Sequence, residues 1–160
     1  MFRSMRRARQ QLSEQESVEI LERGTSGVLA LLGEDGYPYA VPISYALDGR
    51  RLIFHSAKAG HKIDAIRGCG KASFCVIDQD QVVPEEFTTR YRSVIAFGKM
   101  RVLEGQEALE AINRLAERYN PQDLGAGRAR EIEKSRNALC MLALEIEHLT
   151  GKQSKALVGT

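Results

Sequence analysis

The sequence predicts a mainly β (α+β) fold, a six-stranded antiparallel β-barrel with helices at its periphery. Two Asp-Gly turns separate apolar runs in the first third of the chain, which is typical of successive hairpins. Further apolar runs lie on both sides of one amphipathic helix. Six strands in a flat sheet would leave long edges uncovered in a chain of 160 residues, so we expect the sheet to close into a barrel.

The strands are predicted from alternating or continuous apolar runs that end at turn residues. They cover residues 28–32, 37–46, 51–56, 72–77, 91–103 and 139–147. Pro38 and Pro42 have no backbone N–H to donate to a neighbouring strand, so the second strand is predicted at an edge or rim. A rim strand is a place where a ligand can bind.

Helices are predicted around the barrel at four places. Ser13 and Glu16 form a capping box at the start of the first helix, which ends before Gly24. A short helix follows the third strand, an amphipathic helix ends at Asn120-Pro121, and a polar helix precedes the last strand. These helices cover residues 13–23, 61–67, 107–119 and 128–137.

The composition is that of a globular domain in water. Hydrophobic residues make up 43% of the chain and charged residues 28%. No apolar run reaches the roughly 20 residues needed to span a bilayer, so we expect no membrane partner. We expect one domain over residues 13–152, between a flexible basic arm (1–12) and a C-terminal tail (153–160).

The basic residues are unevenly placed. Arg3, Arg6, Arg7 and Arg9 lie in the arm, and taking these four from the 23 basic residues leaves 19 against 21 acidic ones. A nucleic-acid-binding domain carries its positive charge on the folded part, so this balance argues against a nucleic-acid partner. Three interpretations of the arm are open: a solvated start, a tether to an anionic surface, or an organellar presequence.

The cysteines indicate neither disulfide bonds nor a metal site. Cys69, Cys75 and Cys140 are odd in number and lack Cys-x-x-Cys spacing. We therefore expect no bound metal. We expect the protein in the reducing cytoplasm, because its cysteines do not indicate disulfide bonds and we identify no apolar signal segment.

The segment 54–64 is the most informative one for function. A strand ends here, small residues form a loop and a helix begins, and the unpaired N–H groups of a helix start favour an anion. Gly60 allows a ligand to approach the backbone, and Lys62 is a cation where the helix dipole disfavours one, which suggests a bound anion. The alternative is a solvated Lys62 beside an ordinary turn residue, His61.

His55 lies in the apolar strand that leads into this segment. Its position in the strand fits either a structural histidine with a satisfied hydrogen bond or a catalytic or ligand-binding residue. A second unusual segment, residues 84–93, is rich in hydroxyl and guanidinium groups. Such groups can bind a phosphate or a carboxylate. The alternative is a solvated loop with charged side chains.

Six motifs occur in a recognisable order over about residues 14–152. They are Gly-Val-Leu-Ala at 27–30, Gly-Tyr-Pro-Tyr-Ala-Val-Pro-Ile-Ser-Tyr at 36–45, Phe-His-Ser-Ala at 54–57, Gly-His-Lys-Ile-Asp at 60–64, Pro-Glu-Glu-Phe-Thr-Thr-Arg-Tyr-Arg-Ser-Val at 84–94 and Glu-Ile-Glu-His-Leu-Thr-Gly-Lys at 145–152. With these motifs the chain resembles the FMN-binding split β-barrel superfamily, typified by pyridoxamine 5′-phosphate oxidase. Within it, the closest resemblance is to the 5-nitroimidazole-resistance (Nim) branch.

The resemblance implies a split β-barrel that forms a homodimer and binds FMN across the barrel mouth, at the subunit interface. The residues implied to line the flavin, chiefly through backbone groups, are Val41, Pro42, Ile43, Ser44 and Tyr45. Those implied to contact the flavin or its phosphate from the next strand and helix are His55, Ser56, Ala57, Gly60, His61 and Lys62. Ser93 would reach the cofactor from another strand, and Thr88, Thr89 and Arg90 would approach from the partner chain.

Two classes of function are open under this resemblance. The chain lacks the C-terminal Trp and Arg signature of the oxidase, which argues against vitamin B6 oxidation. One class is an FMN-dependent oxidoreductase that reduces nitroimidazoles, other nitro compounds or quinones, with His55 as the catalytic residue that orients or protonates the acceptor. The other class is a non-catalytic flavin carrier or a haem-binding barrel in which His55 or His148 ligates iron.

Overall fold

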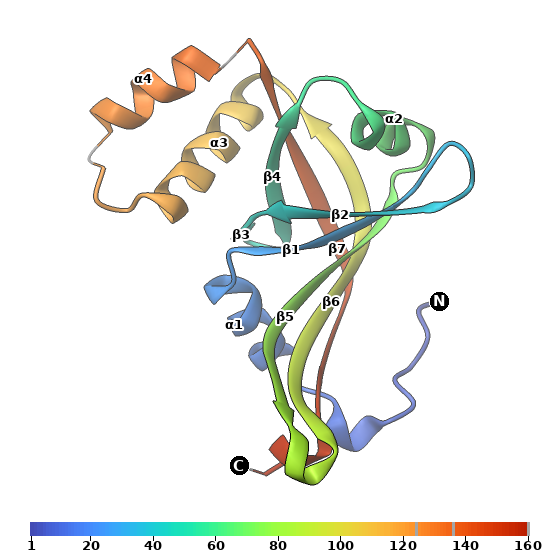
Figure 1. Ribbon diagram of the computed structural model, residues 1–160. Helices are drawn as coiled ribbons and strands as arrows, with labels where there is room; N and C mark the ends of the chain where they lie inside the picture. The colour runs from blue at the N-terminus through green and yellow to red at the C-terminus, as the bar shows by residue number, and fades with distance from the viewer. Residues whose placement is uncertain (124, 136, 160) are drawn as a thin grey trace.

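The chain folds as a curled antiparallel sheet with helices along its outside (Figure 1). The computed structural model describes residues 1–123, 125–135 and 137–159. The strands are β1 (Ser26–Leu32), β2 (Pro38–Ser44), β3 (Ala46–Asp48), β4 (Arg51–Ala57), β5 (Lys71–Val83), β6 (Thr88–Leu103) and β7 (Leu139–Gln153). They are hydrogen-bonded in the order β2-β1-β5-β6-β7-β4-β3. The predicted fold class is confirmed.

Four α-helices surround the sheet in the described residues: α1 (Glu14–Arg23), α2 (His61–Gly68), α3 (Gly105–Tyr119) and α4 (Ala126–Ser135). Short 3-10 turns form at Ala8–Gln10, Pro84–Glu86 and Lys155–Leu157. The predicted capping box of α1 is present, because the backbone N–H of Glu16 donates to Ser13 Oγ at 3.1 Å and that of Ser13 donates to the Glu16 carboxylate at 2.7 Å. Positions 136 and 160, in the predicted helix 128–137 and tail 153–160, lie outside the described residues.

The prediction of six strands was wrong, because the described residues form seven. The predicted second strand divides at Tyr45 into β2 and β3. The backbone N–H of Tyr45 donates to the Thr25 carbonyl at 3.1 Å, and its phenol donates to the Leu21 carbonyl at 2.8 Å. These bonds hold Tyr45 against the start of β1 and the end of α1, so the chain leaves β1 there and continues alongside β4.

The sheet is open between its two edge strands. β2 lies at one edge, as its prolines predict, with Pro42 opposite Val28 of β1. β3 lies at the other edge, and no pairing joins β2 to β3 in the part of the chain that is described. The barrel is therefore split, and the split runs past the end of β2 and the outer side of β4.

The interior of the barrel is filled by aromatic and aliphatic side chains. The rings of Tyr45 and Phe54 pack edge-on against Phe74, with centroids 4.9 and 5.2 Å away. A second, smaller core lies on the outer side of β4 and β7, where Ile53 and Met141 pack against α3. Because β4 is covered on both faces, its sequence reads as a continuous apolar run rather than as an alternating one.

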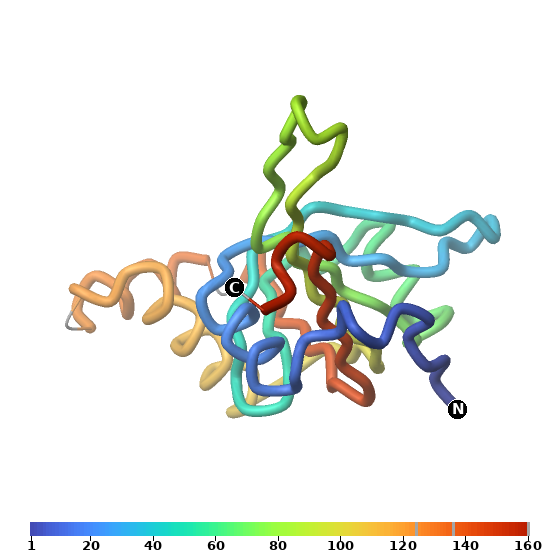
Figure 2. The backbone as a smooth tube through the Cα atoms, turned by 90° about the horizontal axis from the view of Figure 1, so that it is seen from below, coloured from blue at the N-terminus to red at the C-terminus, as the bar shows by residue number. Residues whose placement is uncertain are grey.

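The hairpin of β5 and β6 extends beyond the rest of the sheet as a two-stranded arm (Figures 1 and 2). From Gln79 to Thr88 the two strands pair only with each other among the described strands. Two bonds from the Arg23 guanidinium to the Asp78 carboxylate, at 2.8 and 2.7 Å, fix the base of the arm to α1. Phe87 at its tip is 98% exposed.

The N-terminal segment lies against the sheet. The backbone N–H of Leu12 donates to the Gly151 carbonyl at 2.9 Å, and the Leu12 side chain is buried. The ring of Phe2 stacks on His148 at 4.7 Å between centroids. Within the described ranges, no helix is long and apolar enough to cross a membrane.

A cluster of charged side chains ties α3 to the sheet. Glu107 accepts hydrogen bonds from Arg101 at 2.5 and 2.8 Å and from Arg51 at 2.6 Å. Arg101 also donates to Glu145 of β7 at 2.9 Å. The bonds from Arg101, followed by those from Arg51, lower the pKa of Glu107 from 4.5 to about 2.

Replacing Glu107 by glutamine is expected to lower Tm at neutral pH, because the two guanidinium groups lose their carboxylate. The pKa of Glu107 is lower in the folded chain, so its stabilising effect is complete above pH 4.5 and is lost as the pH falls to about 2. The gap in Tm between wild type and Glu107→Gln should therefore close in this window, measured by thermal unfolding at a series of pH values. Glu110→Gln, on the exposed side of the same helix, is the control. A difference in Tm that stays constant down to pH 2 would contradict the stabilising role assigned to the ion pairs of Glu107.

Candidate functional site

The end of β4 brings two predicted site residues to opposite faces of the sheet. Phe54 and Ser56 point into the barrel and are 0% and 7% exposed. Ile53 and His55 point outward, and Ile53 packs against α3. His55, two residues after Ile53 on the same face of β4, has an exposed side chain. The alternation of a strand thus places Ser56 in the core and His55 at a surface.

His55 lines a cavity of about 580 Å³ between β2, β4, α3 and α4, which we call the His55 cavity. Ser44, at the end of β2, lies on the same wall. The apolar part of the lining comes from Ile112, Leu115, Ala116, Ile132 and Leu139. The cavity therefore has a size and a lining suited to a small, flat organic molecule, with Ser44 and His55 among its polar groups.

Two residues of the helical region build the far side of the His55 cavity. The phenol of Tyr119 donates to the backbone carbonyls of Thr25 and, at 3.2 Å, Tyr45, so it fixes the end of α3 to the sheet. Arg128 of α4 donates to the Glu117 carboxylate at 2.7 Å and joins α4 to α3. Sequence analysis did not single out Tyr119 or Arg128, because nothing in their spacing shows that α3 and α4 fold back over β4.

The turn after β4 is open on its outer side. Gly60 has a φ of 120°, a conformation that favours glycine, and no atom lies within 4 Å of the position that a Cβ would take. Gly60 precedes the first residue of α2, and no side chain caps this helix start. Lys62 is half-buried in the first turn. The backbone N–H groups of this turn and the lysine together suit an anionic group.

His61 packs toward the hairpin of β1 and β2. Its imidazole stacks on Tyr39 with ring centroids 4.1 Å apart. Its Nε2 also lies close to Gly33, where an added Cβ would be only 3.2 Å away. Tyr39 is thus a third residue that the sequence analysis did not identify, although it lies within the motif at 36–45. The stack fixes the distance between β2 and the start of α2.

The β2 residues of the predicted site divide between two faces. Val41 and Ile43 are half-buried against the barrel core, whereas Pro42 is exposed on the opposite face. Tyr45 is fully buried, and this burial raises the pKa of its phenol. The backbone N–H and carbonyl of Tyr45 already have partners in Thr25 and Tyr119.

The remaining predicted residues lie away from this region in a single chain. Thr88, Thr89 and Arg90 lie on the β5–β6 arm, at the opposite end of the molecule from α2 (Figure 1). Arg90 donates to Glu86 at 2.9 Å. Ser93 lies at the base of the arm, opposite Lys152 of β7. In a single chain these residues therefore do not share a site with His61 and Lys62 of α2.

One face of the sheet carries mostly apolar side chains that are exposed or half-buried, and Phe2 of the N-terminal segment packs against one of them, Phe97. Val28, Cys75 and Ile95 form a row across β1, β5 and β6, and Ala30, Ser73 and Phe97 form the row beside it. We call these six positions the outer sheet face. Val28 is 37% exposed, and Ile77, which continues the same side of β5, is 65% exposed.

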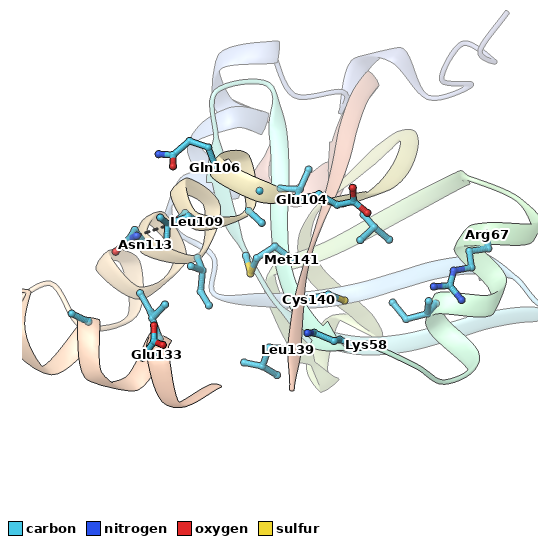
Figure 3. Close-up of a pocket in the computed structure, with 18 residues that line it drawn as sticks. Lys58, Arg67, Glu104, Gln106, Leu109, Asn113, Glu133, Leu139, Cys140 and Met141 are labelled. Carbon is cyan, nitrogen blue, oxygen red and sulfur yellow. Dashed lines mark hydrogen bonds between the residues drawn. The ribbon is translucent and has the colours of Figure 1, made fainter. Parts of the chain in front are cut away.

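A second and larger cavity, of about 980 Å³, lies on the other side of α3 (Figure 3). It is bounded by α2, the start of β7, the junction of β6 with α3, and α4, and we call it the Cys140 cavity. The thiol of Cys140 lies 3.4 Å from the Ala57 carbonyl and donates to it. Burial raises the pKa of this thiol, while the charges of Lys58, Lys62 and Arg67 oppose the rise.

No group of three or more His, Cys, Asp or Glu side chains that could hold a metal ion occurs in the residues that the structure describes. Cys69, Cys75 and Cys140 are all free thiols.

Comparisons with known proteins agree with this architecture. A family model described as pyridoxamine 5′-phosphate oxidase matches residues 13–153. The chain matches no curated protein. Among solved structures it is similar to the FAD and haem binding protein from Mycobacterium smegmatis, with a TM-score of 0.75 and 26% identity over 91% of this chain and 74% of the other.

Two further structures share the fold at lower identity. A candidate 5-nitroimidazole antibiotic resistance protein from Bacteroides thetaiotaomicron has a TM-score of 0.76 and 17% identity, over 89% of this chain and 86% of that one. A conserved hypothetical protein from Mycobacterium tuberculosis has a TM-score of 0.81 and 21% identity, over 96% and 92% of the two chains. These two similarities establish the fold of the barrel.

Proposed function

We propose that this chain, which belongs to the pyridoxamine 5′-phosphate oxidase family, is a flavoprotein that reduces small nitro compounds or quinones. The cofactor is FMN, either free or as the FMN half of a larger nucleotide. The observation that carries the proposal is that Ser44 and His55, on two strands that are not paired, line one cavity, and that the strand with His55 leads into the open turn before α2.

The residues present fit a flavin phosphate. The open backbone at Gly60, the uncapped first turn of α2 and Lys62 offer positive charge and backbone N–H groups to an anion. His61 is held beside it by Tyr39. Similarity to an FAD and haem binding protein at 26% identity supports a flavin in this fold.

A bound flavin would supply electrons to an acceptor, and the chain would bind and orient that acceptor. The apolar side of α3 offers a flat surface to an aromatic acceptor in the His55 cavity. His55 can donate a hydrogen bond or a proton to a nitro or quinone oxygen. α4 covers the cavity and limits the entry of water, since Arg128 holds it to α3.

We also propose that the chain is a homodimer joined through the outer sheet face and the β5–β6 arm. A two-stranded ribbon is marginally stable by itself, so the arm needs a surface to pack against. Ile77, Val82 and Phe87 are exposed on it at 65%, 69% and 98%. A two-fold partner would cover these side chains and bring Thr88, Thr89 and Arg90 to the site of the other chain.

The alternative function is a flavin carrier or a haem-binding barrel. A haem-binding barrel would need a histidine, His55 or His148, that can ligate iron. His148 stacks on Phe2 and also lies near the ring of Phe97, and its Nε2 is buried without a hydrogen-bond partner in the described structure. The atoms that bury Nε2 would have to move before His148 could ligate iron. His55 is exposed toward a cavity and needs no such change.

Mixing the reduced protein with a nitroimidazole in the absence of oxygen should reoxidise the flavin, followed by stopped-flow absorbance. His55→Ala should keep its flavin and lose roughly 10²-fold in rate, the usual size of a general-acid contribution. His148→Ala, which changes a histidine outside the cavity, should react as the wild type does. Absence of reoxidation by any nitro compound or quinone would favour the carrier, and a haem Soret band in the purified protein would favour the haem-binding barrel.

Lys62→Ala should weaken FMN binding far more than riboflavin binding, because the lysine is assigned to the phosphate. A charge-assisted hydrogen bond contributes about 1.5–3 kcal/mol, so we expect FMN affinity to fall by about tenfold or more. Fluorescence titration of the apoprotein with both flavins gives the two affinities. Equal losses for FMN and riboflavin would place Lys62 away from the phosphate.

Ile95→Glu should convert the dimer into monomers, because it places a charge in the centre of the outer sheet face. Flavin affinity should fall in parallel, since residues of the arm would no longer reach the partner's site. Light scattering at a series of concentrations measures the mass. Tyr37→Glu, at an exposed turn position, is the control. A wild-type monomer with flavin fully bound would overturn the dimer.

A further inference from the structure

Residues 1–9 lie beside the sheet, and we call them the N-terminal strap (Figure 1). The strap forms no strand, and only its last two residues enter a 3-10 turn, Ala8–Gln10. The chain is fixed to the sheet soon after it, because Leu12 is buried and its backbone N–H donates to the Gly151 carbonyl of β7 at 2.9 Å. The strap is therefore anchored where it joins the rest of the domain.

One aromatic side chain holds the far end of the strap on the sheet. The Phe2 ring stacks on His148 with centroids 4.7 Å apart and 10° between the planes, and it lies 5.8 Å from the ring of Phe97. His148 and Phe97 are paired in register between β7 and β6. Because Phe97 is one of the six positions of the outer sheet face, the strap covers part of the surface that we assign to the dimer.

The rest of the strap has few contacts. Phe2 is 43% exposed, and Met5 is half-buried. No backbone hydrogen bond joins residues 1–6 to another described residue. The strap also carries four exposed arginines that make no ion pair with a described residue, namely Arg3, Arg6, Arg7 and Arg9. A terminal segment held in this way opens at a low cost in free energy.

A partner that covers the whole outer sheet face needs the place of Phe2. Two sheets that pack face to face lie about 10 Å apart, and the side chains of their two faces fill the space between them. A Phe2 ring that packs against Phe97 takes the room that the partner's side chains would need there. The strap and the partner therefore exclude each other at Phe97.

The charge of the strap opposes an arrangement in which it stays between the two copies. A two-fold interface uses the same surface of both chains, so each copy would bring its own strap into it. The arginines of both straps would then lose water, and they have no carboxylate partner in the described part of their own chain. Burial of unpaired like charges is costly, so the strap leaves the face when the partner binds.

We propose that the N-terminal strap is an autoinhibitory contact, which competes with a second copy of the chain for the outer sheet face. The inference rests on the homodimer of the proposed function. In the closed state Phe2 packs on His148 and Phe97, and the chain is a monomer. In the open state the face is free for the partner, whose β5–β6 arm then reaches the flavin site. The strap thereby controls the assembly of that site.

Phe2→Ala should open the strap and tighten the dimer. Both copies must open before they associate, so a closed-to-open ratio of about ten in each copy raises the dissociation constant by about 100-fold. Phe2→Ala should regain most of this factor, measured by analytical ultracentrifugation over a range of concentrations. Tyr37→Ala, which removes an exposed aromatic ring from the turn between β1 and β2, is the matched control and should dimerise as the wild type does.

Phe2→Trp reports on the strap directly, because the chain has no tryptophan of its own. The larger ring keeps the stack on His148, so this variant should dimerise no more readily than the wild type. With flavin held at saturation, its concentration is raised through the range in which the dimer forms. The tryptophan should then become more accessible to acrylamide, and its emission should shift to longer wavelength.

The outcomes separate this inference from the dimer on which it rests. A tighter dimer in Phe2→Ala and a released tryptophan in Phe2→Trp support the strap. A weaker or unchanged dimer in Phe2→Ala, or a tryptophan that becomes less accessible as the dimer forms, would overturn the strap and leave the homodimer standing. If the wild type and Phe2→Ala are both monomers at every concentration, the proposed dimer itself fails, and this inference fails with it.

Discussion

The anchoring of Tyr45 determines how the two halves of the barrel meet. Its ring packs on Phe74 in the core, its phenol donates to Leu21 of α1, and its backbone groups bond to Thr25 and Tyr119. These contacts end β2 and direct the chain into β3 beside β4. Ser44 is thereby placed across from His55, and the end of α3 is fixed over the split in the barrel. The His55 cavity depends on this one residue.

The insertion of α3 and α4 between β6 and β7 forms the His55 cavity and the Cys140 cavity beside the barrel. Ile112, Ile132 and Leu139 line both, so the His55 cavity and the Cys140 cavity share a wall. His55, near the end of β4, lines one of them, and Lys58, in the turn that follows this strand, lines the other.

The outer sheet face and the arm give a physical reason for dimerisation. The chain leaves a row of mostly apolar side chains on one side of its sheet, and it extends a hairpin whose tip residue, Phe87, is exposed. The predicted Thr88, Thr89 and Arg90 have a place in the site only if that hairpin crosses to a partner. Dimerisation and cofactor binding would then be coupled, because each subunit would contribute residues to the flavin site of the other.

The sequence by itself determined the local elements. The capping box at Ser13, the Asp-Gly turns, the edge position of β2 and the amphipathic pattern of α3 depend on neighbours along the chain, and all formed as predicted. It also singled out the segment from His55 to Lys62 as a candidate site, because a cation and a glycine at a helix start are a local signal.

Only the tertiary structure decided which of these groups share a surface. The division of the second strand at Tyr45, the burial of Ser56, the stack of His61 on Tyr39 and the roles of Tyr119 and Arg128 arise from contacts between residues far apart in sequence. No local pattern encodes which face of β4 the helices will cover, because that choice follows from the packing of α3 against Ile53 and Met141.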